Sequence, residues 1–474
     1  MYIKSIFIAI ILIVFAVLSN QSTAQITSKS DQTVQVDYFA DNGYGNAVAV
    51  VQHPAGIYHK GITYLCYQGP KEDPYVASYN HQIKEWKGPY KAGISEMGKD
   101  PTRKKRIDNH GKPSIMIDNA GYIHIAFGGH GGMKKHGKNV LGNHHYGKNA
   151  HAVSKKPLDI SSWETLDNIP PFGTYNQFVK MDNGDIYLFY RHGAHRSDWV
   201  YQISTDNGRT FSDPISFLKH KRRDDQAAVD SWYPWITKRN GDELMVVFDY
   251  HLCNDNVKGE KKKRHVPKRY NVYYMSFNTK TGQWKNISGE ILPTPLTREV
   301  ADVKTRVAET SGEWTFQGVV TSDIHGNPYI GITVGDEIKG APRSAPKQMQ
   351  YFRWDGEQWL REMQSGLPIS NGDIEIEAEN SIQFYLVEKI DGGLGEVAKW
   401  EKTLKEKFFK KTKILLSKRK ANFAISSLIE NPHPDARFIV AEKKRGTDFR
   451  KMYLIGDQGP IMRPKNQADI LSND

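Results

Sequence analysis

Cysteine is nearly absent from this sequence. Only Cys66 and Cys253 occur among 474 residues, so no disulfide framework can hold the fold together. The chain also lacks the motifs H-E-x-x-H and G-x-S-x-G and a P-loop, which removes the usual sequence support for a zincin protease, an α/β-hydrolase or a P-loop nucleotidase. Stability must come from ordinary packing, and any chemistry must come from a less common set of residues.

Long apolar runs are also scarce, and the clearest one lies at the N-terminus. Lys4 precedes an apolar run from Ile6 to Leu18, and the small-residue sequence Ser22-Thr23-Ala24 follows it. That order is typical of a cleaved export signal, and the run is short for a membrane helix. We expect a signal peptide over residues 1–24 and a secreted or periplasmic mature chain over residues 25–474, with an uncleaved anchor as the alternative.

The charge of the chain is positive. It has 65 Lys and Arg against 53 Asp and Glu, a net charge of +12, and loss of Lys4 with the signal leaves +12 − 1 = +11. Basic runs occur at residues 103–106, 219–223 and 258–269. In an exported protein such runs favour an acidic or sulfated polysaccharide over nucleic acid as the partner, although any one of them is more often a solvated loop.

Repeated turn and strand patterns dominate the chain, which has 40 Gly and 22 Pro. A polar turn with Gly leads into an apolar or aromatic strand at residues 118–127, 182–190, 240–249 and 325–334. A strand, a polar turn and a Trp follow one another at residues 79–86, 277–284 and 352–359. These patterns predict successive antiparallel hairpins.

One motif is sharper than these repeats. Residues 204–211, S-T-D-N-G-R-T-F, match the Asp-box pattern S-x-D-x-G-x-T-W/F, in which Asp206 and Gly208 shape a hairpin turn. At about 60 residues per four-stranded blade the mature chain would form about seven blades. We predict an all-β fold, a single-domain seven-bladed β-propeller, and leave open whether residues 399–420 form a helix or a strand pair.

Histidines stand out among the residues that can carry chemistry. His110 lies in D-N-H-G-K-P-S, just before a predicted strand, and His130 lies in G-G-H-G-G, just after that strand pair. Loops at strand ends build the central pocket of a propeller. Both histidines are therefore pocket candidates, although a single loop histidine is more often an ordinary surface residue.

A second group combines tyrosines with an arginine. Tyr175 lies in T-Y-N-Q-F, Arg191 in F-Y-R-H-G and Tyr233 in D-S-W-Y-P-W. Arg191 ends an apolar strand, where a cation needs a partner. The alternative is a buried arginine satisfied by carbonyl groups, with tyrosines that belong to the core.

A third group has the side chains of a metal site. His251 and Cys253 form an H-x-C pair, which places both on the same side of an extended strand. His195 or His265 could complete a tetrahedral zinc site with them. The spacing is less specific than paired C-x-x-C motifs, and a buried thiol among unrelated histidines explains it equally well.

These segments together resemble a known family, the BNR-type seven-bladed propellers that include the ulvan lyases of polysaccharide lyase families 24 and especially 25. The resemblance covers residues 38–277 clearly. It rests on D-N-H-G-K-P-S, G-Y-I-H-I-A-F-G-G-H, Y-N-Q-F, F-Y-R-H-G, the Tyr233-Pro234 segment, and F-D-Y-H followed by R-Y-N-V-Y-Y. The remainder of the chain resembles the family only in its repeated turn and strand patterns, which are typical of a propeller.

The resemblance assigns roles to residues of this chain. It implies a catalytic set of His110, His130, Tyr175 and Arg191, with Arg191 and Tyr233 binding substrate. It also implies one structural Zn²⁺, and no organic cofactor, with four ligands: His195, His251, Cys253 and His265. The long basic insertion between Cys253 and His265 departs from the family pattern.

The chemistry agrees with these roles. A lyase acting on a uronate removes the weakly acidic C5 proton and expels the O4 substituent, which requires a carboxylate neutraliser, a base and an acid. Arg191 can pair with the carboxylate in a fork geometry, assisted by His130. We favour His110 as base and Tyr175 as acid, although the sequence does not fix which residue takes which role.

The main hypothesis is therefore an exported, monomeric endo-lyase that cleaves ulvan, a sulfated rhamnose-uronate polymer, by β-elimination. A close alternative is a related propeller enzyme on rhamnose-glucuronate linkages, either a lyase or an exo-rhamnosidase. A sialidase-like hydrolase shares the Asp box but would need three arginines and a Tyr/Glu pair that we do not find. A non-catalytic glycan-binding propeller is the fourth possibility, and it would not need two histidines beside a Tyr and an Arg. The sequence does not fix the oligomeric state, the sulfation preference or the choice between glucuronate and iduronate.

Overall fold

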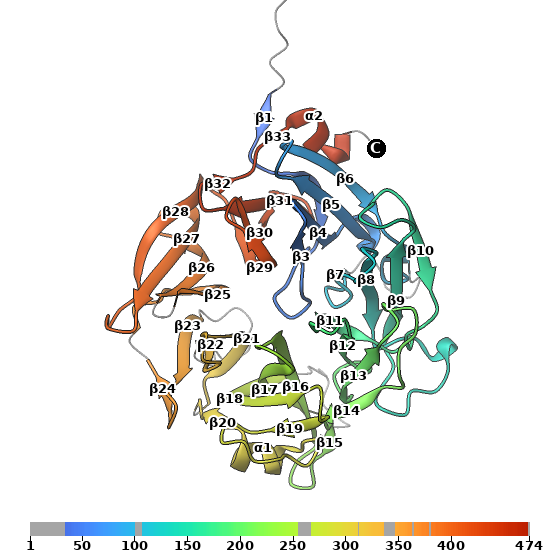
Figure 1. Cartoon of the computed structure of the whole chain (residues 1–474), viewed down its shortest axis with the longest axis vertical. Helices are drawn as coiled ribbons and strands as arrows, with labels where there is room; N and C mark the ends of the chain where they lie inside the picture. The colour runs from blue at the N-terminus through green and yellow to red at the C-terminus, as the bar shows by residue number, and fades with distance from the viewer. Residues whose placement is uncertain are drawn as a thin grey trace, which may run out of the picture.

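The computed structural model describes residues 34–99, 107–254, 267–310, 312–335, 347–362, 365–378 and 381–472. Within these ranges the chain is almost entirely β-structure, and its sheets stand in a ring around a central axis (Figure 1). Seven blades can be traced, which confirms the predicted single-domain seven-bladed β-propeller. The predicted signal peptide lies outside the described residues.

The first four blades follow one another along the chain, each with its innermost strand first. Blade 1 contains β3 (Gly56–His59), β4 (Ile62–Gln68), β5 (Pro74–Asn80) and β6 (Glu85–Lys91). Blade 2 contains β7 (Ser114–Ile117), β8 (Ile123–His130), β9 (Tyr146–Ser154) and β10 (Trp163–Leu166). Blade 3 contains β11 (Thr174–Lys180), β12 (Ile186–Arg191), β13 (Trp199–Ser204) and β14 (Ile215–Leu218). Blade 4 contains β16 (Ala228–Lys238), β17 (Glu243–Asn254), β18 (Pro267–Asn278) and β19 (Gln283–Lys285), with β15 (Lys221–Arg222) and β20 (Arg306–Ala308) added at its edges.

The remaining blades complete the ring. Blade 5 contains β21 (Trp314–Ser322), β22 (Pro328–Gly335), β23 (Gln348–Trp354) and β24 (Trp359–Arg361). Blade 6 contains β25 (Ser370–Ala378), β26 (Ser381–Ile390), β27 (Leu394–Thr403) and β28 (Lys410–Arg419). Blade 7 contains β29 (Phe423–His433), β30 (Ala436–Lys443), β31 (Phe449–Gly456) and, from the start of the chain, β2 (Ala40–Tyr44), with β32 (Gly459–Pro460) added.

The two ends of the described chain close the ring. Strand β2 pairs antiparallel with β31 of the last blade, and β1 (Gln35–Val36) pairs with β33 (Arg463–Pro464). A single parallel pair, Glu430 with Ile57, links blade 7 to blade 1. Strands from both ends of the chain thus complete one blade and close the ring.

Short helices occupy connections between and beyond the strands. They are α1 (Arg298–Lys304), α2 (Lys465–Ala468), η1 (Pro70–Glu72), η2 (Met97–Lys99), η3 (Lys134–His136) and η5 (Ile470–Ser472). No helix in the described ranges has the length and apolar character needed to cross a membrane.

The local sequence explains the hairpins. In the Asp box, the Asp206 carboxylate accepts hydrogen bonds from the backbone amides of Arg209 (3.1 Å) and Thr210 (2.9 Å) and from the Thr210 hydroxyl (2.6 Å). Gly208 has φ +74°, a conformation that favours glycine. Asp206 thus stabilises the turn between β13 and β14, as predicted. Residues 399–420, which the sequence left open, lie mainly in the antiparallel pair β27 and β28.

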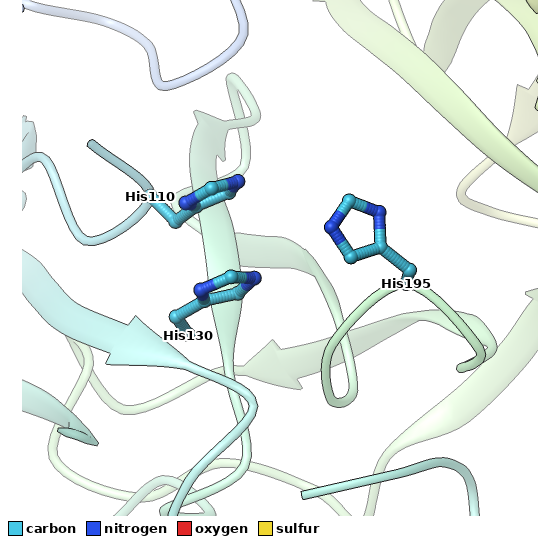
Figure 2. A group of neighbouring side chains, drawn as sticks. All are labelled: His110, His130 and His195. Atoms are coloured by element: carbon cyan, nitrogen blue, oxygen red, sulfur yellow. The ribbon is translucent and has the colours of Figure 1, made fainter. Parts of the chain in front are cut away.

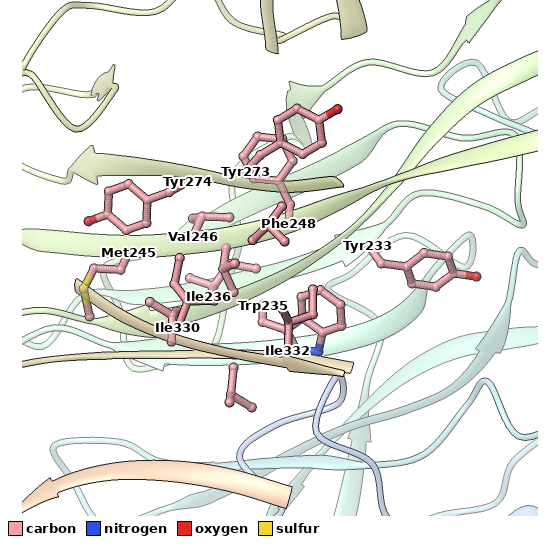
Figure 3. Close-up of a cluster of buried hydrophobic side chains, with 14 of the residues drawn as sticks. Tyr233, Trp235, Ile236, Met245, Val246, Phe248, Tyr273, Tyr274, Ile330 and Ile332 are labelled. Atoms are coloured by element: carbon pink, nitrogen blue, oxygen red, sulfur yellow. The ribbon is translucent and has the colours of Figure 1, made fainter. Parts of the chain in front are cut away.

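Aromatic and aliphatic side chains fill the space between blades. Figure 3 shows Trp235, Val246 and Phe248 of blade 4 and Ile330 of blade 5, which belong to a cluster that extends from blade 3 to blade 6. Each fully buried side chain of this size stabilises the fold by about 1.5–3 kcal/mol. The buried thiols Cys66 and Cys253 are both free, so packing holds the blades together without a disulfide, as expected.

Candidate functional site

His110, in the segment before β7, and His130, at the end of β8, lie against each other. The imidazoles of His110 and His130 are stacked, with ring centroids 3.7 Å apart and an interplanar angle of 9° (Figure 2). The carboxylate of Asp108 forms a hydrogen bond with each of them. Its Oδ1 bonds with the Nδ1 of His110, and its Oδ2 lies 2.7 Å from the Nδ1 of His130. Because an ionised carboxylate can only accept, each histidine donates its Nδ1–H, which leaves Nε2 as the free basic position.

The charge state of this trio follows from its surroundings. Burial opposes ionisation of Asp108, but the adjacent rings of His130 and His110 outweigh it and hold the pKa of the carboxyl well below its ordinary value. Burial lowers the pKa of both histidines, and nearby positive groups lower it further. The Asp108 carboxylate raises it, but by less. Both rings are therefore neutral near pH 7, and each can take up a proton.

Glycines allow the loop that carries His130 to approach blade 3. A Cβ on Gly129 would lie 2.1 Å from the carbonyl oxygen of Gly173, and one on Gly131, where φ is +91°, would lie 2.7 Å from the amide nitrogen of Ala194. Side chains larger than hydrogen would push these loops apart. The G-G-H-G-G sequence therefore brings His130 within 5.8 Å of the His195 ring, centroid to centroid.

A β-bulge aims Tyr175. The pairing of β11 with β12 shifts between Thr174 and Gln177, and Tyr175 has φ +63°, which is rare for a bulky residue. The bulge points the Tyr175 ring toward His110, with centroids 5.4 Å apart. Burial, reinforced by the neighbouring Tyr233, raises the pKa of Tyr175 well above its ordinary value, so its phenol keeps its proton.

Arg191 lies fully buried at the end of β12. Its Nε donates to the Gly193 carbonyl at 3.4 Å, whereas its Nη1 and Nη2 have no hydrogen-bond partner among the described residues. Its guanidinium carbon lies 4.9 Å from the Tyr175 ring centre and 5.4 Å from that of Tyr233. The guanidinium of Arg191 is thus a buried cation with two unsatisfied donors between aromatic rings. Such a group can bind a planar anion.

His195 faces His110 and His130 (Figure 2) and also belongs to a second cluster, with His251 and Cys253. The Cys253 sulfur lies 3.5 Å from the Nδ1 of His251, and the two side chains project from the same side of β17, as the H-x-C pattern predicts. One potential ligand atom from each of the three residues lies within 4.8 Å of the other two. A thiol and two imidazoles suit zinc. His265, the predicted fourth ligand, lies outside the described residues.

The structure thus brings together all the predicted site residues that it describes. Sequence analysis overlooked Asp108, two residues before His110, although an acid beside a histidine was a signal that could have been used. It also overlooked Arg269, whose guanidinium carbon lies 4.1 Å from the Tyr233 ring centre and whose position depends on strand pairing.

Comparison with known proteins shows the family of this chain. Residues 62–365 match a family described as BNR repeat-containing. An ulvan lyase from Nonlabens ulvanivorans is 59% identical over 473 residues, 100% of both chains, and one from Alteromonas sp. (strain LOR) is 52% identical, covering 96% of this chain and 93% of its own. A solved polysaccharide lyase PL25 ulvan lyase superposes with a TM-score of 0.87 at 52% identity, covering 92% of this chain and 100% of its own.

A more distant likeness concerns the fold alone. The solved polysaccharide lyase Uly1 superposes with a TM-score of 0.58 at 14% identity, covering 88% of this chain. The full-length matches above 50% identity exclude a propeller that only binds glycans. They are stronger evidence for the enzyme class than any single motif. This chain belongs to the BNR-repeat ulvan lyases of polysaccharide lyase family 25, and it is a polysaccharide lyase.

Proposed function

We propose that this protein cleaves ulvan within the chain by β-elimination at the uronate, releasing oligosaccharides with an unsaturated uronyl end. Full-length relatives named ulvan lyases support the substrate. A family structure bound to -[GlcA(1-4)Rha3S]-, 51% identical to this chain, supports an alternating uronate and sulfated rhamnose. The net charge of +12 favours such a polyanion.

Arg191 carries the proposal. Its two unsatisfied Nη groups are buried beside Tyr175 and can form a bidentate pair with the uronate carboxylate. Pairing becomes stronger as negative charge moves onto the carboxylate during loss of the C5 proton, so it stabilises the enolate-like transition state more than the ground state. A lysine could not supply the same fork.

The two proton transfers are assigned from charge state. His110 is neutral because burial lowers its pKa, and its Nδ1–H points to Asp108, so its Nε2 can accept the C5 proton. Tyr175 keeps its phenolic proton and can donate it to the O4 leaving group. His130, held by the other oxygen of Asp108, assists Arg191 in neutralising the substrate carboxylate.

Absorbance of the conjugated product tests this function. Purified mature protein mixed with ulvan should give a steady rise in the ultraviolet band of an unsaturated uronate, while heparin and pectin should give none. A fall in viscosity early in the reaction would establish internal cleavage. Release of free rhamnose without any ultraviolet rise would instead identify an exo-rhamnosidase and overturn the proposal.

We also propose that His195, His251, Cys253 and His265 hold one structural Zn²⁺. The thiol and imidazoles present fit that ion, and burial of Cys253 and His251 favours a closed site. When bound, zinc would cross-link the loop after β12 to the end of β17 and so support the wall behind the pocket. Metal analysis of the purified protein should give one zinc per chain.

Export is the last part of the proposal. The N-terminal sequence described above supports Sec-type secretion to the periplasm or medium, where a large polysaccharide substrate would be encountered. N-terminal sequencing of the secreted protein should begin at Gln25. Retention of the full-length chain in the cytoplasm would contradict this part alone.

A further inference from the structure

A cluster of metal-ligating side chains lies where the ring closes, on the face of the propeller opposite the candidate active site. His81 follows β5 of blade 1, His433 ends β29 of blade 7, and Asp435 lies in the turn between β29 and β30. The first and third strands of each blade end at this face, whereas His130 stands at the end of a second strand, β8. The cluster is therefore separate from the pocket.

The three side chains are close enough to share one ion. The rings of His81 and His433 have centroids 4.0 Å apart, and the Oδ2 of Asp435 lies 3.8 Å from the Nδ1 of His433. One ligand atom from each residue lies within 4.8 Å of those of the other two. Two ligands of a tetrahedral zinc ion stand about 3.3 Å apart when each bond is about 2.1 Å long. Small side-chain rotations would therefore bring all three atoms to one ion.

The hydrogen bonds of His81 leave one ring nitrogen for a metal. Its Nε2 lies 2.9 Å from the Thr63 hydroxyl oxygen, and its Nδ1 is buried with no hydrogen-bond partner in the part of the chain that the structure describes. A proton on Nε2, donated to Thr63, leaves a lone pair on Nδ1, which is how a ligating histidine is commonly held. Burial and the neighbouring His433 lower the pKa of His81 to about 4, so the ring is neutral at higher pH.

His433 and Asp435 bring the other two ligands from blade 7. The Nδ1 of His433 accepts the backbone N–H of Asp435 at 3.1 Å, so this nitrogen carries a lone pair, and a metal would replace the amide as its partner. The side chains of His433 and Asp435 are 30% and 61% exposed, which leaves room for water to complete the coordination. Two imidazoles and a carboxylate suit a divalent transition-metal ion such as Zn²⁺ better than Mg²⁺ or Ca²⁺.

We propose that His81, His433 and Asp435 bind one divalent transition-metal ion of the zinc class, and that this ion clasps blade 7 to blade 1. Within the described ranges, backbone pairing between the innermost strands of these blades is limited to Glu430 with Ile57. An ion ligated from both blades adds a cross-link at this closure. Because the ligands meet only in the folded ring, binding stabilises the protein against unfolding by mass action. The inference does not depend on the proposed function.

Equilibrium dialysis with Zn²⁺ and thermal unfolding test the clasp. The purified mature protein is first dialysed without metal, so that exposed sites lose their ions. On addition of Zn²⁺, wild type should bind one ion per chain more than His433→Asn. Saturating Zn²⁺ should raise the Tm of wild type by about 3 °C and that of His433→Asn by less than about 1 °C. Without added zinc the two should have the same Tm. His325→Gln replaces an exposed histidine in the corresponding turn of blade 5 and should behave as wild type.

Two results would overturn the clasp. One is equal zinc binding by wild type and His433→Asn, and the other is an equal rise in their Tm values. The cluster of His195, His251 and Cys253 does not confuse the test, because Cys253→Ser should keep the ion that His433→Asn loses. If His433→Asn is already less stable without zinc, Asp435→Asn decides, since it changes only an exposed carboxylate. An unchanged affinity of Asp435→Asn for Zn²⁺ would then reject the site.

Discussion

Two histidine clusters meet at His195 in this protein, and they differ in the side chain that accompanies the imidazoles: the Asp108 carboxylate in the first and the Cys253 thiol in the second. In the first cluster, Asp108 accepts from both His110 and His130. In the second, Cys253 approaches His251 and His195, and its sulfur lies 3.5 Å from the nearest His251 nitrogen. The rings of His130 and His195 are only 5.8 Å apart.

The comparison shows that the side chain next to an imidazole determines whether that imidazole suits proton transfer or metal binding. A carboxylate fixes one tautomer and leaves a single basic nitrogen, which suits proton transfer. A thiol supplies a soft ligand that favours a metal ion, and metal binding occupies the nitrogen that would otherwise accept a proton. The predictions below test whether the two clusters are separable in this way.

The largest effect is expected from Tyr175→Phe. Loss of the phenolic proton should lower kcat by about 10³-fold, within the range for general acids, while zinc content and Tm stay unchanged. Product absorbance, metal analysis and thermal unfolding provide the three readouts. Tyr90→Phe, in the outer strand of blade 1, should keep full activity. Normal product formation by Tyr175→Phe would remove the tyrosine from the reaction.

Asp108→Asn should have the next largest effect. An amide cannot accept from both histidines with equal geometry, so the tautomers are no longer fixed, and kcat should fall about 10²-fold with little change in KM. Nitrogen NMR of the His110 side chain should show mixed tautomers, and zinc content should remain at one per chain. Asp213→Asn, at an exposed position just before β14, is the control. Full activity of Asp108→Asn would mean that the carboxylate only supports the fold.

Cys253→Ser tests the second cluster. Replacing the thiolate should weaken zinc binding at least about 100-fold and lower the Tm, with activity falling as a consequence. Cys66→Ala removes the other buried thiol and should keep its zinc. Zinc lost from both variants would show a general effect of destabilisation, and zinc retained by Cys253→Ser would place the ion elsewhere.

The pH profile should be broad. The base must be neutral, and burial lowers the pKa of His110 from 6.5, so kcat/KM is lost only as pH falls below about 6.5. The acid must be protonated, and the raised pKa of Tyr175 puts the alkaline limb above pH 10. We expect values within about 2-fold between pH 7 and 9. An acid limb centred above pH 7 would exclude His110 as the base.

The smallest effect on activity should come from His151→Gln, because this residue belongs to neither cluster. Burial and the nearby His124 lower the pKa of His151 to about 3. Between pH 6.5 and 3 the unfolded chain binds a proton that the folded chain does not, so stability falls as pH falls, by up to about 1.4 kcal/mol per pH unit. Unfolding by denaturant at several pH values should show a weaker pH dependence in the variant.

Several features could be predicted from sequence because their causes are local. Alternating apolar strands and glycine turns determine hairpins wherever they occur, and the Asp box encodes its own turn through Asp206. The H-x-C pattern places His251 and Cys253 on one side of a strand through the two-residue period of β-structure. The motifs around His110, His130, Tyr175 and Arg191 predicted the candidate site residues, but not the contacts between them.

Only the tertiary structure decided how those residues meet. The bulge that aims Tyr175 depends on the pairing of β11 with β12, and the stacking of His110 on His130 depends on strands that end at the same place. Arg269 and Lys347 lie 78 residues apart in sequence, and blade packing alone brings both to the Phe316 ring. The sequence determined the strands and the chemical groups, because these follow from neighbours along the chain. The tertiary structure determined the distances, charge states and shared partners, because these follow from neighbours in space.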